Sequence, residues 1–252
     1  MNISGVVYVI IILIVVYYLF SWFTSTSSKL VSRTSTDVET KVKGSKIYTS
    51  GNSYAYSIWF NITNWTENFG NEKIIFIQSS QSVSDFTGEY TLNGEGESIN
   101  SPKDVLVVSL APHENNLNIH VPVANSSGNI TTHTAVVYGV PIQKWVNLTI
   151  SFDQKVIDIY MDGKLVKTSV APSMPLKAID STNYNLTICP TNKTFAGEIS
   201  KFKFHKSSLN PQEAWEIYKE GFGSGVLSGL VNRYKLKIAF LKDDQEFNSF
   251  ML

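Results

Sequence analysis

The sequence predicts an all-β protein, an antiparallel two-sheet sandwich of the jelly-roll type with one short helix, preceded by an N-terminal transmembrane helix. Three observations predict it. Eleven short runs rich in Val, Ile, Thr, Tyr and Phe alternate with turn residues, as in sandwich proteins. One segment, "NPQEAWEIYKE" at 210–220, carries the signals of a capped helix. An uncharged apolar run stands near the N-terminus.

Composition limits the function classes. The 252 residues fit one anchored domain with tails. The formal net charge is zero, so no global field attracts nucleic acid, and we expect no nucleic-acid partner. Cys189 is the single cysteine, which excludes an intrachain disulfide and favours a reducing compartment.

The apolar run follows a short flank, residues 1–5, and extends over residues 6–23, "VVYVIIILIVVYYLFSWF". Its 18 residues span about 27 Å as a helix, enough to cross a hydrocarbon core. "MNISG" lacks the basic residues of a signal peptide, so we expect an uncleaved anchor in the lipid bilayer. The residues taken to represent the membrane contact are Val6, Ile10, Leu13, Tyr17, Phe20, Trp22 and Phe23.

The flanking charges predict the side on which the domain lies. No Lys or Arg precedes the run, whereas five follow it: Lys29, Arg33, Lys41, Lys43 and Lys46. The positive-inside rule therefore predicts a cytoplasmic domain. Eight Asn-x-Ser/Thr sequons favour the opposite side, but sequons report acceptor chemistry and not exposure to the glycosylation machinery. We give the flanking charges and the lone cysteine more weight.

The remaining chain divides into three parts. Residues 24–46 begin with the polar "TSTSSKLVSRTS" and are expected to form a stalk and the approach to the domain. Residues 47–222 are expected to form the sandwich, and residues 223–252 are expected to form a C-terminal extension with an added strand at 234–241. The other expected strands are 55–62, 72–79, 104–110, 116–123, 133–140, 145–152, 156–161, 164–170, 183–189 and 198–205.

The expected helix has signals at both ends. Asn210 is the predicted N-cap, Pro211 occupies the first turn, and Glu213 stands at the capping-box position. Leu209 and Ala214 can form a hydrophobic staple, and Gly221 ends the helix.

The most legible stretch is "VIDIYMDGKLVKT", residues 156–168, in which Asp162 and Gly163 are expected to form a type I′ hairpin turn. If Asp153-Gln154 is also a two-residue turn, three strands form a meander with one apolar face. The expected facing pairs are Ile150 with Ile157, Leu148 with Ile159, Val146 with Met161, Ile159 with Val166, and Asp158 with Lys167. The hairpin is predicted to be structural.

The opposite face of this meander carries Trp145, Asn147 and Tyr160. Two aromatic rings beside an amide suit a glycan-binding platform. Exposed aromatic residues mark protein contacts equally well, and an ordinary outer face covered by a neighbouring protein is the favoured interpretation.

"VPIQKWVNLTISFDQKVIDIYMDGKLVKTS" and "FAGEISKFKFHKSSLNPQEAWEIYKEG" resemble the laminin-G-like branch of the concanavalin A-like lectin/glucanase fold, and "YSIWFNITNW" is similar to its early strand. The resemblance covers roughly residues 47–222 and implies this sandwich. The layout of anchor, stalk, one such domain and tail resembles membrane-anchored proteins of large icosahedral DNA viruses of algae and protists, which implies a virion component.

The sequence does not indicate an enzyme. Glycan hydrolysis needs two carboxylates flanking the scissile bond. Asp158 and Asp162 are better explained by an ion pair and by the turn. The histidines lack metal-ligand spacing, no cofactor is implied, and Cys189 is expected to be a buried thiol. Calcium is left open, although the loop residues follow no ligand pattern: Asp85, Glu89, Glu95 and Glu97.

Residues 233–242 alternate basic and apolar side chains, which suits a strand that covers a sheet edge or joins a partner's sheet. The sequence thus predicts a minor capsid-type structural protein that tethers an internal viral membrane to the capsid shell. The domain would face the capsid on the cytoplasmic side, and its partners would be capsid or membrane proteins. The alternative is a glycan-binding attachment protein on a viral or cell surface.

Overall fold

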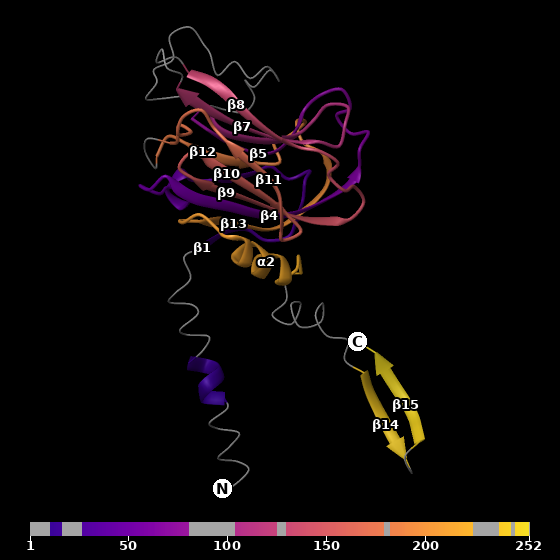
Figure 1. Cartoon of the computed structure of the whole chain (residues 1–252). Helices are drawn as coiled ribbons and strands as arrows, with labels where there is room; N and C mark the ends of the chain where they lie inside the picture. Colours follow the sequence, from indigo (N-terminus) through magenta and orange to yellow (C-terminus); the bar gives the residue numbers. More distant parts are fainter. Residues whose placement is uncertain are drawn as a thin grey trace.

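The computed structural model describes residues 11–16, 27–80, 104–124, 130–178, 182–223, 237–242 and 245–251. In this part the chain forms two stacked antiparallel sheets with one helix packed on the outside (Figure 1), which confirms the predicted sandwich. The seven-stranded sheet contains β1 (Ser27–Val31), β2 (Thr34–Ser35), β13 (Ala196–His205), β4 (Ser53–Asn64), β9 (Trp145–Asp153), β10 (Val156–Met161) and β11 (Lys164–Val170). The six-stranded sheet contains β3 (Thr40–Val42), β12 (Asn185–Ile188), β5 (Lys73–Ser79), β6 (Asp104–Leu110), β7 (Leu117–Ala124) and β8 (Ile130–Val137).

The core lies between the sheets, where alternate residues of each strand meet. In β4, Tyr56, Ile58 and Phe60 point into the core and are almost fully buried. The intervening Ser57 and Trp59 point to the outer face, yet they are also buried. The seven-stranded sheet is therefore covered on both faces at β4.

The cover on the outer face is α2 (Pro211–Lys219). The predicted capping box is confirmed, because Asn210 Oδ1 accepts from the Glu213 amide at 3.0 Å and Glu213 Oε2 accepts from the Asn210 amide at 2.8 Å. Leu209 and Ala214 are both buried, in agreement with the expected staple. Gly221, with φ of 65°, follows the last turn.

The predicted register of the meander is wrong by two residues. Val156 pairs with Asp153, so the turn consists of Gln154 and Lys155, and Ile159 faces Ile150. A shift of two preserves the face on which each side chain lies, because side chains alternate with period two. Ile150 and Ile159 therefore still point into the core.

The Asp162-Gly163 turn is confirmed, since Met161 pairs with Lys164 and both turn residues have positive φ, 50° and 73°. A β-bulge between Ile159 and Tyr160 then changes the expected pairs. Asp158 accepts from Thr168 Oγ1 at 2.6 Å and does not pair with Lys167.

The expected apolar layer also stops at β10. Leu165, Val166 and Val170 of β11 are 45–65% exposed, because β11 is the last strand of its sheet.

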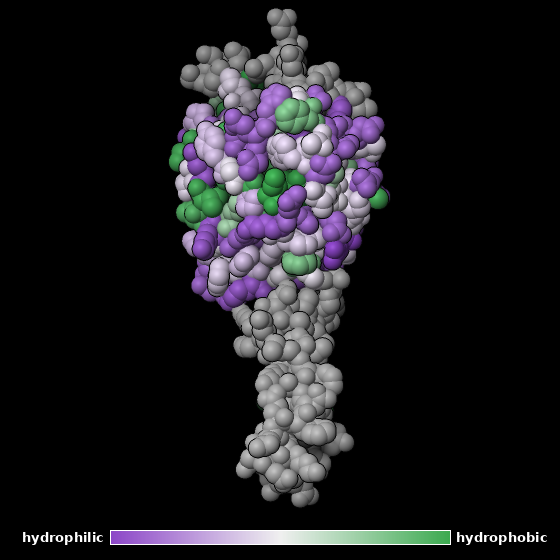
Figure 2. Space-filling view, turned by 90° about the vertical axis from the view of Figure 1, so that its right-hand side faces the viewer, coloured by the Kyte–Doolittle hydropathy of each residue, from purple (hydrophilic) through white to green (hydrophobic). Residues whose placement is uncertain are grey.

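On the face shown in Figure 2, hydrophobic residues form small groups among hydrophilic ones. Scattered exposed hydrophobic residues of this kind are common on protein surfaces.

From residue 27 onward, the expected stalk is part of the sandwich. β1 pairs with β13, β2 extends that pairing, and β3 pairs with β12. A 3-10 turn, η1 (Gly44–Lys46), follows β3. Ser and Thr made "TSTSSKLVSRTS" look flexible, but β-branched residues also suit an edge strand once a neighbour supplies the hydrogen bonds.

Of the expected anchor, the structure describes a helical segment at residues 11–16, which includes Leu13. The other representative positions, Val6, Ile10, Tyr17, Phe20, Trp22 and Phe23, lie outside the described residues, as do the acidic loop positions Asp85, Glu89, Glu95 and Glu97. Within the described part, no helix is both long enough and apolar enough to cross a bilayer.

The strand expected at 234–241 corresponds to β14 (Lys237–Lys242), which pairs with β15 (Gln245–Met251) in a separate two-stranded sheet. The sequence analysis did not foresee β15. Within the described residues, β14 is not paired with either sheet of the sandwich.

Replacement of Gly163 by alanine should destabilise the domain by about 2–4 kcal/mol. The added Cβ would lie 2.9 Å from Trp215 Cε3 and 3.1 Å from Trp215 Cα, at a φ of 73° that disfavours alanine. Gly139→Ala is the matched control, with φ of 70° and nothing within 4 Å of the new Cβ, and should cost only about 1 kcal/mol. Urea unfolding of the detergent-solubilised chain measures both, and equal losses would contradict the packing argument.

Candidate binding groove beside the helix

The helix is fixed to the outer face of the seven-stranded sheet at its N-terminal end. The Leu209 amide donates to Ser151 Oγ at 2.7 Å, and the Tyr160 hydroxyl donates to the Leu209 carbonyl at 3.4 Å. Both sheet residues are almost fully buried. The polar outer positions of β9 and β10 therefore serve as attachment points for the segment that begins α2.

The C-terminal end of the helix packs on aromatic rings. Tyr218 stacks on Trp59 with ring centroids 5.6 Å apart, and Phe222 stacks on Trp145 at 4.6 Å. The Arg33 guanidinium also lies over Trp145, 5.3 Å from the ring centroid. The ring stacking buries Trp59, whose indole nitrogen Nε1 has no hydrogen-bond partner in the described part of the chain.

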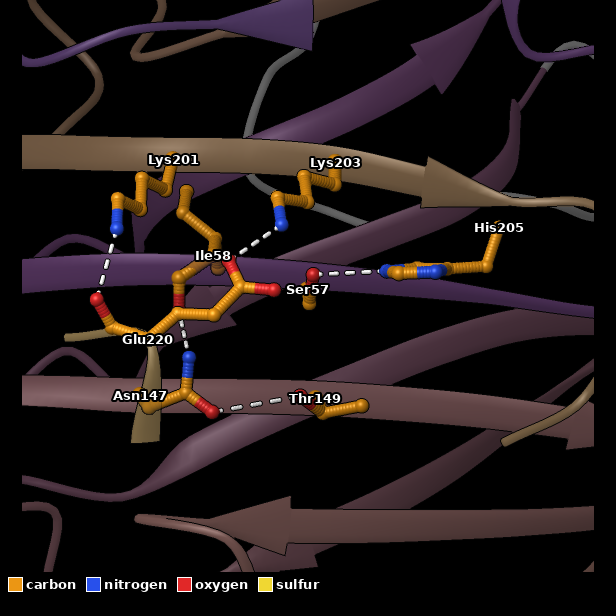
Figure 3. A network of polar contacts seen from close by, with 8 residues as sticks. All are labelled: Ser57, Ile58, Asn147, Thr149, Lys201, Lys203, His205 and Glu220. Carbon is orange, nitrogen blue, oxygen red and sulfur yellow. Dashed lines mark hydrogen bonds and ion pairs between the residues drawn. The ribbon is translucent and has the colours of Figure 1, made fainter. Parts of the chain in front are cut away.

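Polar side chains fill the rest of the covered face (Figure 3). Lys203 forms a 2.6 Å ion pair with Glu220, and Lys201 donates to the Glu220 carbonyl at 2.9 Å. His205 Nε2 lies 2.9 Å from Ser57 Oγ. Burial, together with the nearby Lys203 charge, lowers the pKa of His205 to about 4, so the ring is neutral near pH 7.

The Ser57–His205 pair resembles a nucleophile and its base, but Ser57 is only 1% exposed. A nucleophile must meet its substrate, so this geometry suits a structural hydrogen bond. The sequence analysis considered His205 only as a metal ligand and missed this contact. The spacing of Ser57 and His205 in the chain carries no signal for it.

In the structure, most of the predicted aromatic platform is covered and buried. Asn147 and Tyr160 are 0% and 1% exposed, because α2 and the segment after it cover them. Asn147 instead donates through Nδ2 to the Ile58 carbonyl at 3.5 Å (Figure 3). The face is therefore not an open ligand platform, and its covering comes from the chain itself. Trp145 stays partly exposed.

Trp145 lies at the wall of a groove of about 410 Å³ beside the C-terminal end of α2. The groove is lined by Trp59, Trp145, Tyr218 and Phe222, with Lys144, Lys219 and Asp162 as charged members. Lys144 Nζ is 3.5 Å from Asp162 Oδ2, and both side chains retain exposure to solvent. Aromatic walls with two cations and one anion suit a partner that presents both an apolar surface and polar groups.

Asp162 and Gly163 hold the groove in place. Asp162 Oδ1 accepts from the Asn147 amide at 2.9 Å, and the Asp162 amide donates to the Asn147 carbonyl at 2.9 Å. Gly163 lies directly beneath Trp215 and Tyr218 of α2. These contacts give the hairpin a place in the packing of the outer face, and Asp162 also lines the groove. That the hairpin is structural and not a binding site stays a prediction.

A second polar cluster lies on the six-stranded sheet and was missed by the sequence analysis. Glu72 accepts from Ser109 Oγ at 3.2 Å and from Asn118 Nδ2 at 3.4 Å, and His120 Nε2 is 3.8 Å away. Burial lowers the pKa of His120 to about 4. No local motif marks this cluster, because its members come from β6, β7 and the residue before β5.

The remaining candidate groups have structural surroundings. Cys189 is fully buried, and burial raises the pKa of its thiol to about 12, which leaves it protonated and unreactive. Among the described residues, no group of three or more His, Cys, Asp or Glu side chains could hold a metal ion. Asp158 and Asp162 are bonded to Thr168 and Asn147 respectively, and they do not face one another across a shared site.

Comparison with known proteins identifies the fold family. The profile described as the concanavalin A-like lectin/glucanases superfamily matches residues 34–214. No curated protein matches the chain at a significant level. The chain is similar to a type C botulinum neurotoxin structure, described as dependent for cell entry on two ganglioside molecules, with 14% identity and a TM-score of 0.43 over 68% of this chain and 36% of that one.

The type G botulinum neurotoxin receptor-binding domain is also similar, with 17% identity and a TM-score of 0.45 over 77% of this chain and 46% of that one. The receptor-binding domain of the mosaic C/D serotype shows 11% identity and a TM-score of 0.49 over 77% and 45%. The chain spans less than half the length of these structures.

Acidification should destabilise the domain between about pH 6.5 and pH 4. His120 and His205 have folded-state pKa values of about 4, below the ordinary 6.5, so the unfolded chain binds more protons in this window. The stability contribution is complete above pH 6.5 and is lost as the pH falls to 4. His205→Asn should unfold with a shallower pH dependence than the unmodified chain in urea titrations at pH 7 and pH 4.5. An equally steep dependence would contradict the assignment.

Proposed function

Because the chain belongs to the concanavalin A-like lectin/glucanases superfamily, we propose that it is a non-catalytic binding module, held at a membrane by residues 6–23. In its most specific form, the proposal is that the chain is a minor structural protein of a large DNA virus. It would tether the internal membrane to the capsid shell by protein contacts. The observation that carries the proposal is the groove beside α2, whose aromatic walls and charged rim suit a protein surface.

A binding role is favoured over catalysis by the use of the carboxylates. Hydrolysis of a glycosidic bond by the common route needs two carboxyl groups about 5–10 Å apart across the scissile bond. The Asp158 carboxylate accepts a hydrogen bond from Thr168. The Asp162 carboxylate accepts a hydrogen bond from the Asn147 amide and forms an ion pair with Lys144. The Asp158 contact lies within the hairpin, and the Asp162 contacts join the hairpin turn to Lys144 and β9, so both carboxylates take part in the packing of the fold.

A tether is favoured by the close connection between the apolar run and the rigid body. The run ends at Phe23 and β1 begins at Ser27. A sandwich attached in this way stays beside its bilayer and cannot search a large volume, which suits permanent attachment between two layers of an assembly. The absence of Lys and Arg before the run supports a cytoplasmic, capsid-facing domain.

Fractionation of purified particles or membranes tests the tether. The protein should resist alkaline carbonate, enter the detergent phase, and be protected from protease in intact particles. Lys144→Glu in the groove rim should reduce its retention with the capsid layer at least several-fold, because one reversed charge faces the partner. Lys167→Glu on β11 is the control and should have no effect. Protease removal of the domain from intact particles would contradict the proposal.

Glycan binding is the second candidate, favoured by the partly exposed Trp145 in the groove and by the Glu72 cluster, since sugars bind to aromatic rings and to paired amide and carboxylate groups. An array of purified glycans incubated with the detergent-solubilised chain tests it. Specific binding that is lost in Glu72→Gln or in Lys144→Glu would favour an attachment protein. Uniformly negative arrays would leave the tether as the function.

A further inference from the structure

The first strand of the sandwich begins very close to the end of the apolar run. Three residues separate Phe23 from Ser27, the first residue of β1, so four Cα–Cα steps join them. At about 3.5 Å per residue, the connection reaches at most about 14 Å. If residues 6–23 span a bilayer, as the proposed function states, the β1 end of the sandwich must lie within that distance of the end of the span.

The residues around this end belong to β1 and β13. Ser27 pairs with His205, and Lys206 follows directly in the chain. Lys29 pairs with Lys203, and directly opposed residues project to the same face of a sheet. Lys203 bonds to Glu220 beside α2, so Lys29 lies on the outer face as well. Figure 1 shows β1 and α2 on the same side of the sandwich.

Some of the basic residues of β1 and β13 form ion pairs, and others do not. Lys203 forms an ion pair with Glu220, and Arg33 is paired through two hydrogen bonds with Glu198. Lys29 and Lys206 are both exposed, and neither forms an ion pair with a described residue. Two lysines therefore remain available beside the point where the chain enters the sandwich.

Other charged or titratable groups of β13 and α2 form hydrogen bonds within the domain. Glu213 caps α2 through Asn210, and Lys201 donates to the Glu220 carbonyl. His205 is buried and bonded to Ser57. On β1 and the end of β13 beside it, the exposed charges without an ion pair are therefore those of two lysines, whereas the exposed Asp153 lies on β9, two strands beyond β13, and accepts from Ser53 Oγ.

From the chain length and this charge pattern we infer that the β1 end binds the anionic headgroups of the bilayer through Lys29 and Lys206. The lysines fix the orientation of the sandwich on the membrane. Each lysine close to an anionic surface strengthens attachment about fivefold, and the attraction falls off within a Debye length. This inference deepens the proposed function and rests on the anchor assumed there.

The orientation leaves the groove accessible. Ala55 of β4 pairs with His205 near the membrane end, and Trp59 in the groove wall lies four residues farther along the same strand. Four residues of a strand extend about 13 Å. The groove is therefore displaced from the headgroups, toward the side from which a partner protein can approach.

Energy transfer from the domain to the lipid surface tests the orientation. The full chain is reconstituted in phosphatidylcholine vesicles, with or without about one third phosphatidylserine, that contain a headgroup-labelled acceptor lipid. A donor dye is attached at Ser207→Cys, which is exposed beside Lys206, or at Tyr138→Cys, which is 75% exposed just after β8 of the other sheet. Cys189 is buried, so the unmodified chain should take up little dye.

Transfer from position 207 should exceed transfer from position 138, and phosphatidylserine should increase it. Lys29→Gln combined with Lys206→Gln should remove that increase. The matched control, Lys164→Gln combined with Lys167→Gln on the opposite edge of the sheet, should retain it. Equal transfer from positions 207 and 138, or an increase that survives the first pair of substitutions, would overturn the inference.

The two levels of the proposal fail in different ways. If alkaline carbonate releases the protein from the vesicles, the anchor and with it the proposed function are wrong. If the protein stays in the vesicles but position 207 is no closer to the lipid than position 138, the anchor stands and the lipid-binding end is wrong.

Discussion

The rest of the outer face depends on the contact between Gly163 and α2. A Cβ at this position would lie within about 3 Å of Trp215 and Tyr218, so the helix rests directly on the backbone of the turn. The same residue needs positive φ to close the hairpin between β10 and β11. Glycine alone satisfies both conditions without strain. One residue thus joins the hairpin geometry to the position of the helix.

The position of α2 on the sheet explains why β4 and β9 carry buried side chains on both faces. Both strands carry core side chains on one face and small polar or aromatic side chains on the other, and both faces are buried. Burying Ser57, Asn147 and Thr149 is tolerable because each forms a hydrogen bond beneath the cover. The groove is the gap left where α2 ends at Lys219 and Phe222 stacks on Trp145.

The strands β1 and β2 stand where the sequence predicts a flexible stalk. A flexible stalk would let the sandwich sample many orientations, whereas β1 pairs with β13 immediately after the connection from residue 23. The body and the strands at residues 27–42 are therefore one unit. The groove beside α2 and the start of β1 lie at different positions along β4, since Trp59 lines the groove and Ala55 pairs with His205, the partner of Ser27.

The sequence by itself determined the strands from 55 to 205, the capped helix and the Asp162-Gly163 turn, because alternation, capping and turn chemistry are local properties. Tertiary structure decided the rest. The bulge at Tyr160 displaced Asp158 from Lys167, pairing with β13 made a strand of the expected stalk, and α2 covered Asn147 and Tyr160. Period-two alternation shows which residues share a face, but not what covers that face. The Glu72 cluster and the Ser57–His205 pair join residues up to 148 positions apart, so only the folded chain brings them together.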